Sequence, residues 1–154
     1  MGTRREGREA AIQYLYQLDL NERELSAVPD DFWGLRSSST NAKPSPKLRV
    51  FAEQIVAGVT AHLEDIDGRI KQYAENYELH RIAAVDRNIL RVAIYEMLFC
   101  PDVPPVVSIN EAIEIAKRFG SEESGRFVNG ILDRVRSELR RPAREPQGPE
   151  TRTR

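Results

Sequence analysis

The sequence predicts an all-α fold, and three observations support this. Apolar residues recur three and four positions apart over most of the chain, which is the spacing of one helix face. Outside residues 126–133, no stretch suggests a strand or hairpin. Prolines and glycines stand between the periodic segments, as they do at Pro101, Pro104 and Gly120. We therefore expect a set of packed helices.

Composition narrows the class of protein. The chain has 154 residues, enough for one domain with a core, and 40% of them are hydrophobic and 31% charged. The net charge of −1 means that nucleic-acid binding would depend on a local basic patch. No apolar run approaches the ~20 residues of a membrane span, and no signal-peptide stretch follows the N-terminus. We expect a cytoplasmic protein.

The first helix is predicted from Arg4 to about Asn21, with one apolar face formed by Ala11, Ile12, Leu15 and Leu18. Residues 26–47 then break the periodicity with prolines and a serine-rich run. This composition is typical of a long, mobile loop. Three apolar residues within it could attach one end to the domain: Phe32, Trp33 and Leu35.

Helical spacing resumes from Leu48 to Val59, breaks near His62, and continues from Ile66 to Tyr77. From Leu79 to Phe99 the pattern becomes apolar nearly all round. A helix of this kind is buried on all sides, so we place it at the centre of the fold.

Two further helices are predicted to meet at Gly120, a natural helix stop. Ser108 and Glu111 form a capping-box pattern at the start of the first of them. Asn129-Gly130 is the usual mark of a tight hairpin, but the apolar stripe around it has the helical period, so we predict a helix there. Gly125 and Gly130 would then allow another helix to approach closely.

Residues 141–154 are too polar and proline-rich to fold, which leaves a domain of residues 1–140 and a disordered tail.

No catalytic motif is present. The sequence lacks a phosphate-cradling glycine loop, a nucleophile elbow and a His-Glu-x-x-His motif. The single Cys100 and the two distant histidines, His62 and His80, do not suggest a metal site. We expect no enzymatic activity, no metal and no cofactor.

Arg4, Arg5 and Arg8 lie in the first turns of a helix, where the macrodipole favours anions rather than cations. An external polyanion would satisfy these arginines and the free N–H groups together. Glu6 and Glu9 neutralise part of the cluster, so phosphate binding and an ordinary charged surface both remain open.

A second basic cluster surrounds the joint at Gly120, formed by Lys117, Arg118 and Arg126. Ser124 and Phe127 lie beside it. Basic side chains next to an aromatic ring suit single-stranded RNA, because the phosphates are neutralised while a base stacks. The alternative is that Phe127 belongs to the core, and the residues alone favour that interpretation.

Asp86 lies within one helical turn of arginines, a pattern typical of a solvated helix face.

Four segments of the chain form a distinctive set of motifs. They are RREGREAAIQYLYQLDL at 4–20, VDRNILRVAIYE at 85–96, DVPPVVSINEA at 102–112 and SINEAIEIAKRFGSEESGRFVNGILD at 108–133. Together they resemble the NusB family of bacterial transcription antitermination factors. The resemblance implies two packed three-helix subdomains. It also implies binding of boxA-type single-stranded RNA together with NusE, a protein of the small ribosomal subunit. The resulting antitermination complex helps RNA polymerase read through terminators, notably in ribosomal RNA operons.

The resemblance also assigns roles to residues. The RNA-contacting positions of the family fall on the two basic clusters: Arg4, Arg5, Arg8, Ser124, Arg126 and Phe127, with Lys117 and Arg118 nearby. The NusE-facing surface includes the start of the central helix, at Asp86. Two features depart from the family, since the arginine cluster is thinner than in many relatives and residues 34–47 look inserted or lengthened.

Two other functions are open. The same domain occurs at the front of some ribosomal RNA cytosine methyltransferases, but no cofactor-binding glycine loop or Pro-Cys motif follows here. The chain could also be a protein-interaction module or a homodimer whose basic joint is incidental. Binding of short single-stranded RNA would separate that alternative from an RNA-binding factor.

Overall fold

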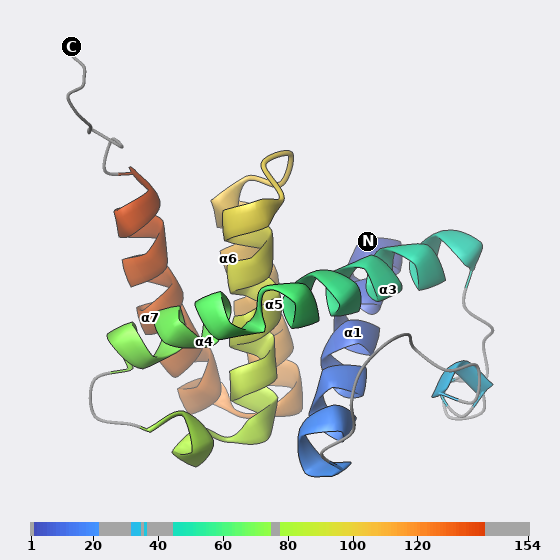
Figure 1. Ribbon diagram of the computed structural model, residues 1–154, viewed down its shortest axis with the longest axis horizontal. Coiled ribbons are helices and arrows are strands. Elements are labelled where there is room, and N and C mark those ends of the chain that lie inside the picture. Colours follow the sequence, from blue (N-terminus) through green and yellow to red (C-terminus); the bar gives the residue numbers. More distant parts are fainter. Residues whose placement is uncertain (1, 22–31, 35, 37–44, 75–77, 141–154) are drawn as a thin grey trace.

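The computed structural model describes residues 2–21, 32–34, 36, 45–74 and 78–140. Within these residues all regular secondary structure is helical and no strand occurs, which confirms the all-α prediction (Figure 1). The elements are α1 (Gly2–Asn21), α3 (Pro46–Ala61), α4 (Leu63–Tyr73), the 3₁₀ helix η1 (Leu79–Arg81), α5 (Ala84–Phe99), α6 (Pro105–Phe119) and α7 (Glu122–Arg140). None of the helices in the described part has the length and apolar character that crossing a membrane requires.

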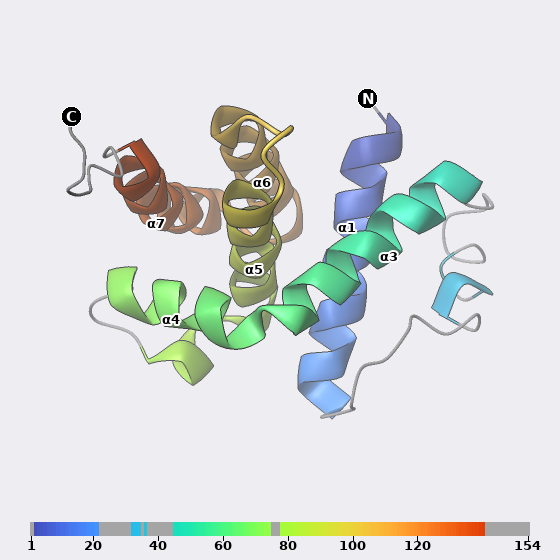
Figure 2. The same cartoon turned by 45° about the horizontal axis from the view of Figure 1, so that its top comes forward.

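The helices form two groups that meet at α5 (Figure 1, Figure 2). In the first group α1 packs against α3, and in the second α5, α6 and α7 pack on one another. Helices α3 and α4 follow each other with a bend at His62, as the sequence predicts. Helix α5 contacts α1, α3, α4, α6 and α7, so it occupies the centre of the fold.

Helix α5 is buried as predicted, but it begins later. Ile89, Leu90 and Ile94 are almost fully buried. The expected helix from Leu79 is instead η1 followed by Ala84 as the first residue of α5. The Arg87 guanidinium explains the break, because its Nη1 donates to the carbonyls of Leu79 and Ile82 at 3.1 and 2.8 Å and holds the chain in a separate turn.

The predicted capping box at the start of α6 is wrong. The helix begins at Pro105 with Pro104 as its N-cap, one turn earlier than expected, and proline is well suited to the first helical position. Ser108 and Glu111 form tertiary contacts instead. The Ser108 hydroxyl donates to Glu96 at 2.8 Å, and Glu111 accepts from Arg5.

Helix α7 runs without interruption through Asn129-Gly130, which confirms the helical prediction there. A Cβ at Gly125 would lie 2.8 Å from the Lys117 Cγ, so this glycine permits the close approach of α6. A Cβ at Gly130 would meet no atom, so the prediction that Gly130 also permits a close helix approach was wrong.

Phe32 and Trp33 are buried and attach their segment to the domain, as expected. Leu35, most of the predicted loop and the predicted tail lie outside the described residues.

Candidate nucleic-acid interface

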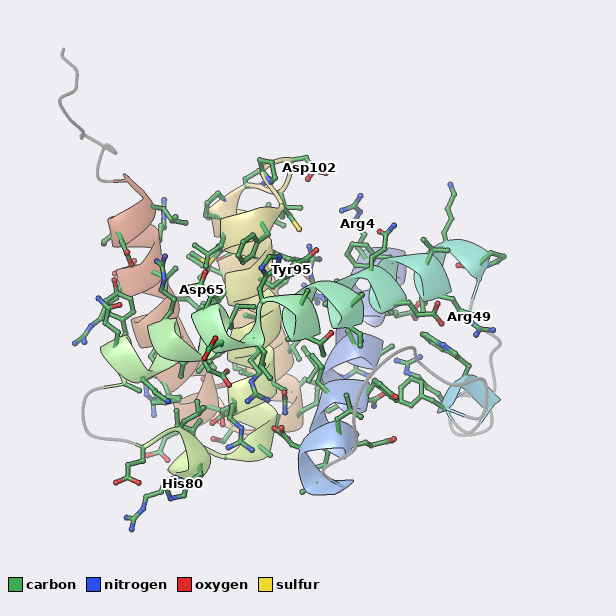
Figure 3. All side chains as sticks on the ribbon, in the orientation of Figure 1. Arg4, Arg49, Asp65, His80, Tyr95 and Asp102 are labelled. Atoms are coloured by element: carbon green, nitrogen blue, oxygen red, sulfur yellow. The ribbon has the colours of Figure 1, made fainter. Side chains whose placement is uncertain are left out.

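The three arginines predicted at the start of α1 have different environments. Arg4 lies at the surface with its guanidinium 5.1 Å from the centre of the Phe51 ring, and it forms no ion pair with any described residue (Figure 3). Arg5 forms a bidentate pair with Glu111, with both N–O distances at 2.8 Å. Arg8 is buried, and its Nε lies 2.9 Å from a carboxylate oxygen of Glu96.

These contacts show which groups balance the positive charges at the start of α1. The first turn of α1 contains no acidic residue, and carboxylates of α5 and α6 supply the negative charge. The hydrogen bond from Arg5 holds the pKa of Glu111 below its usual range, against the opposing effect of burial. A phosphate at Arg5 would therefore have to displace Glu111. Arg8 is not accessible, and its predicted phosphate contact stays a prediction with no support from its position.

The basic residues of the joint lie at the surface. The Arg118 guanidinium is 2.9 Å from Glu9 of α1, although the Arg118 side chain is 65% exposed. The Lys117 ammonium is 3.7 Å from Glu114. Arg126 is exposed and forms no ion pair within the part of the chain described. The pairs Arg5–Glu111 and Glu9–Arg118 both join α1 to α6. One arginine of each basic cluster, Arg5 and Arg118, thus takes part in an ion pair between these two helices.

A cleft of about 390 Å³ lies between the start of α5 and the start of α7. Its lining includes Arg81, Asp86, Ser121, Glu123, Ser124 and Phe127. The Phe127 side chain is partly buried and packs against the core while it also lines this cleft. The core and surface interpretations of Phe127 therefore each describe part of its environment, and stacking on RNA stays a prediction.

Asp86 does not lie on a solvated helix face, contrary to the prediction. Arg87 and Arg91 form ion pairs with Asp19 and not with Asp86. Asp86 is half-buried and accepts a hydrogen bond from the Ser124 hydroxyl at 3.3 Å. Burial raises the pKa of Asp86, and this hydrogen bond offsets the effect only in part. A residue predicted for RNA and one predicted for a protein partner are thus in direct contact.

A polar network that sequence reasoning missed positions the start of α5. Arg91 donates to Asp67 of α4 at 2.9 and 3.0 Å and to Asp19 of α1 at 3.0 and 3.1 Å, and Arg87 and Asn88 also donate to Asp19. Burial alone would raise the pKa of Asp19, but Arg91, Asn88 and Arg87 outweigh it and the pKa is lowered. The network fixes α5, and with it Asp86, against the N-terminal helices.

Among the described residues no cluster of potential ligands could hold a metal ion.

Comparisons with known proteins match this chain over most of its length. The model of the NusB family matches residues 5–137. The transcription antitermination protein NusB of Myxococcus xanthus is 44% identical over 142 residues, which is 92% of this chain and 100% of that protein. The solved structure of T. maritima NusB has a TM-score of 0.72 at 39% identity, and the match covers 88% of this chain and 91% of that one. A crystal structure of the antitermination factors NusB and NusE in complex with dsRNA matches with a TM-score of 0.74 at 25% identity, covering 90% and 98% of the two chains.

Proposed function

The chain belongs to the NusB family, and from this premise we propose that it is a transcription antitermination factor that binds boxA-type single-stranded RNA together with NusE. The observation that carries the proposal is the match to an antitermination protein along 92% of this chain and the whole of that relative. The matched relatives are transcription antitermination proteins, and we infer that this chain, like them, acts as a regulatory factor and not as an enzyme. The complex would act on RNA polymerase in the cytoplasm, promoting read-through and ribosomal RNA synthesis.

The proposed RNA contacts differ in how available they are. Arg4, Lys117 and Arg126 are exposed and would neutralise phosphates, which position RNA without reading its sequence. Arg5 and Arg118 would contribute only where a phosphate competes with their carboxylate partners. Among the uncharged contacts, the Phe127 ring would stack on a base at the cleft, and the Ser124 hydroxyl would bond to the same nucleotide.

The proposed NusE contact lies at the start of α5, around Asp86. A half-buried carboxylate at the mouth of a cleft can pair with a basic side chain of a protein partner, and such pairs steer association. The crystal structure of the related NusB with NusE and dsRNA supports a protein partner and an RNA acting together on this fold.

Fluorescence anisotropy with a labelled boxA RNA tests the proposal. We expect single-stranded boxA RNA to bind more tightly than a shuffled strand, both alone and with NusE. Arg4→Gln should weaken binding to both RNAs and reduce the slope of log affinity against log salt by about one, because one phosphate contact is lost. An unchanged salt slope would remove Arg4 from the interface.

Two results would contradict parts of the proposal. Equal affinity for a boxA duplex would contradict the preference for a single strand, and the dsRNA in the related complex makes this control necessary. Failure to bind either RNA, with or without NusE, would leave the protein-interaction or homodimer module as the function. Light scattering would then measure the oligomeric state directly.

A further inference from the structure

Two buried aromatic residues fasten part of the segment between α1 and α3 to the domain. The Phe32 and Trp33 side chains are 6% and 3% exposed. The Trp33 indole N–H donates to Glu53 of α3 at 2.8 Å, and the Phe32 ring packs edge-to-face on Tyr14 of α1 with the ring centres 5.1 Å apart. Buried aromatic rings with a satisfied N–H give this anchor a defined position on both helices.

Arg36 follows Trp33 by three residues and reaches an exposed face of α1. Its Nε donates to the side-chain oxygen of Gln13 at 2.9 Å. On the same face, the Arg118 guanidinium of α6 is 2.9 Å from Glu9. Residues four apart on a helix are neighbours, with about 5–6 Å between their Cβ atoms. Gln13 and Glu9 therefore bring the two arginines to adjacent turns of α1, one from each side of the helix.

The electrostatics of Arg36 agree with this geometry. Burial lowers the pKa of Arg36, and Glu9 and Glu6 oppose this effect without cancelling it. The positive charge of Arg118 lowers the pKa further, so the two guanidinium groups repel each other. Glu9 is buried beneath this surface, whereas Glu6 is exposed. A phosphate between Arg36 and Arg118 would relieve the repulsion and accept charge-assisted hydrogen bonds from both.

We propose that Arg36 is a further RNA contact, held by the Phe32–Trp33 anchor so that it binds a phosphate together with Arg118. The inference rests on the proposed function, because Arg118 belongs to the proposed RNA surface at the joint. Arg36 extends that surface from α6 across α1, and it gives the anchored segment a role in binding. A phosphate contact of this kind raises affinity for every RNA sequence and adds no sequence preference.

Fluorescence anisotropy with labelled single-stranded boxA RNA, at a series of salt concentrations, tests the contact. Arg36→Gln should lower the affinity by about twofold to fivefold, the range of an exposed charge pair. It should also reduce the slope of log affinity against log salt by about one. Arg36→Lys keeps the charge and should keep the slope.

Arg136→Gln is the matched control, because it removes the same charge from the last turns of α7. These turns lie far from α1 in both views (Figure 1, Figure 2). The control should bind RNA as the unmodified protein does. If the salt slope of Arg36→Gln equals that of the control, Arg36 contacts no phosphate and the inference is wrong.

A double-mutant cycle tests the anchor. Trp33→Leu removes the hydrogen bond to Glu53 and should lower RNA affinity about as much as Arg36→Gln, and the two changes together should cost no more than either alone. Additive losses would overturn the positioning role of Trp33. Circular dichroism checks folding, and Glu53→Ala, which removes the same hydrogen bond, serves if Trp33→Leu does not fold. The proposed function fails separately, if the unmodified protein binds no RNA under any condition.

Discussion

Phe127 contributes to the core and lines the cleft at once, so a substitution there should affect stability and RNA binding by different mechanisms. We expect Phe127→Ala to weaken binding of boxA RNA by about 1–3 kcal/mol, which is the contribution of stacking one base on an aromatic ring. The slope of affinity against salt should stay nearly unchanged, because no phosphate contact is removed. Anisotropy titrations at several salt concentrations measure both quantities.

Stacking must be separated from packing at Phe127. A fully buried phenylalanine replaced by alanine costs about 3–5 kcal/mol of stability, and the partial exposure of Phe127 should make the loss smaller. Phe127→Leu is the matched control, since it keeps most of the apolar volume but lacks the flat ring. If Phe127→Leu binds RNA as well as the unmodified protein, the stacking role is wrong.

At the scale of single residues, the sequence indicated which charged positions are unusual but not which residues pair with them. The spacing singled out Arg5 and Arg8 as unusual at a helix start, and both are involved in charge pairing. Their partners, Glu111 and Glu96, lie 106 and 88 residues away along the chain. Spacing reports which residues share a turn or a face, and it carries no information on pairs brought together by the packing of distant helices. The half-buried environment of Asp86 was missed for the same reason.

Two glycines of α7 provide a test at the scale of a helix. Gly130 has open space around its missing Cβ, whereas a Cβ at Gly125 would lie 2.8 Å from the Lys117 side chain on α6. We expect Gly130→Ala to raise the free energy of unfolding by about 1 kcal/mol, the gain in helix propensity. Gly125→Ala has the same intrinsic gain, but it should be offset or reversed because the Lys117 side chain must leave its present position against Gly125. Urea unfolding of both variants measures the difference. Equal stabilisation by the two substitutions would show that the α6–α7 contact can yield at Gly125 without cost.

Helical periodicity predicted the elements and their order, and it failed at some of their starts. The bend at His62, the central position of α5 and the continuous α7 follow from the spacing of apolar residues. The starts of α5 and α6 do not, because the hydrogen bonds of Arg87 to the preceding turn and of Ser108 to Glu96 favour other starts. The local capping pattern of Ser108 and Glu111 competes with the contacts of these two residues to Glu96 and Arg5, and here the tertiary contacts prevail.

At the scale of the whole molecule, ion pairs connect α1 to the C-terminal helices near both of its ends. Arg5–Glu111 and Glu9–Arg118 join α1 to α6, and Asp19 joins α1 to Arg87 and Arg91 of α5. The candidate site needs both connections, since the proposed RNA contacts lie on α1, α6 and α7 and the proposed NusE contact lies on α5. We infer that the charged network holds these surfaces in a fixed relation.

The Asp19 network should make stability depend on pH. Asp19 has a lowered pKa in the folded protein, so its contribution is complete above the ordinary value of about 3.9 and is lost as the pH falls through the folded value. We expect Asp19→Asn to lower the free energy of unfolding at pH 7 by about 1–3 kcal/mol, the usual cost of leaving shielded charged groups without a partner. Urea unfolding at a series of pH values from 7 downward measures the difference between the two proteins.

The difference between Asp19→Asn and the unmodified protein should shrink below about pH 4, because protonation of Asp19 removes the same charge that the substitution removes. Asp65→Asn is the matched control, since Asp65 is exposed on α4 and forms no ion pair among the described residues (Figure 3). Its stability should follow that of the unmodified protein throughout. If the deficit of Asp19→Asn is the same at every pH, the loss comes from packing and not from the charge of Asp19. The pairing of Asp19 with Arg87 and Arg91 would then orient α5 without a contribution of the Asp19 charge to stability.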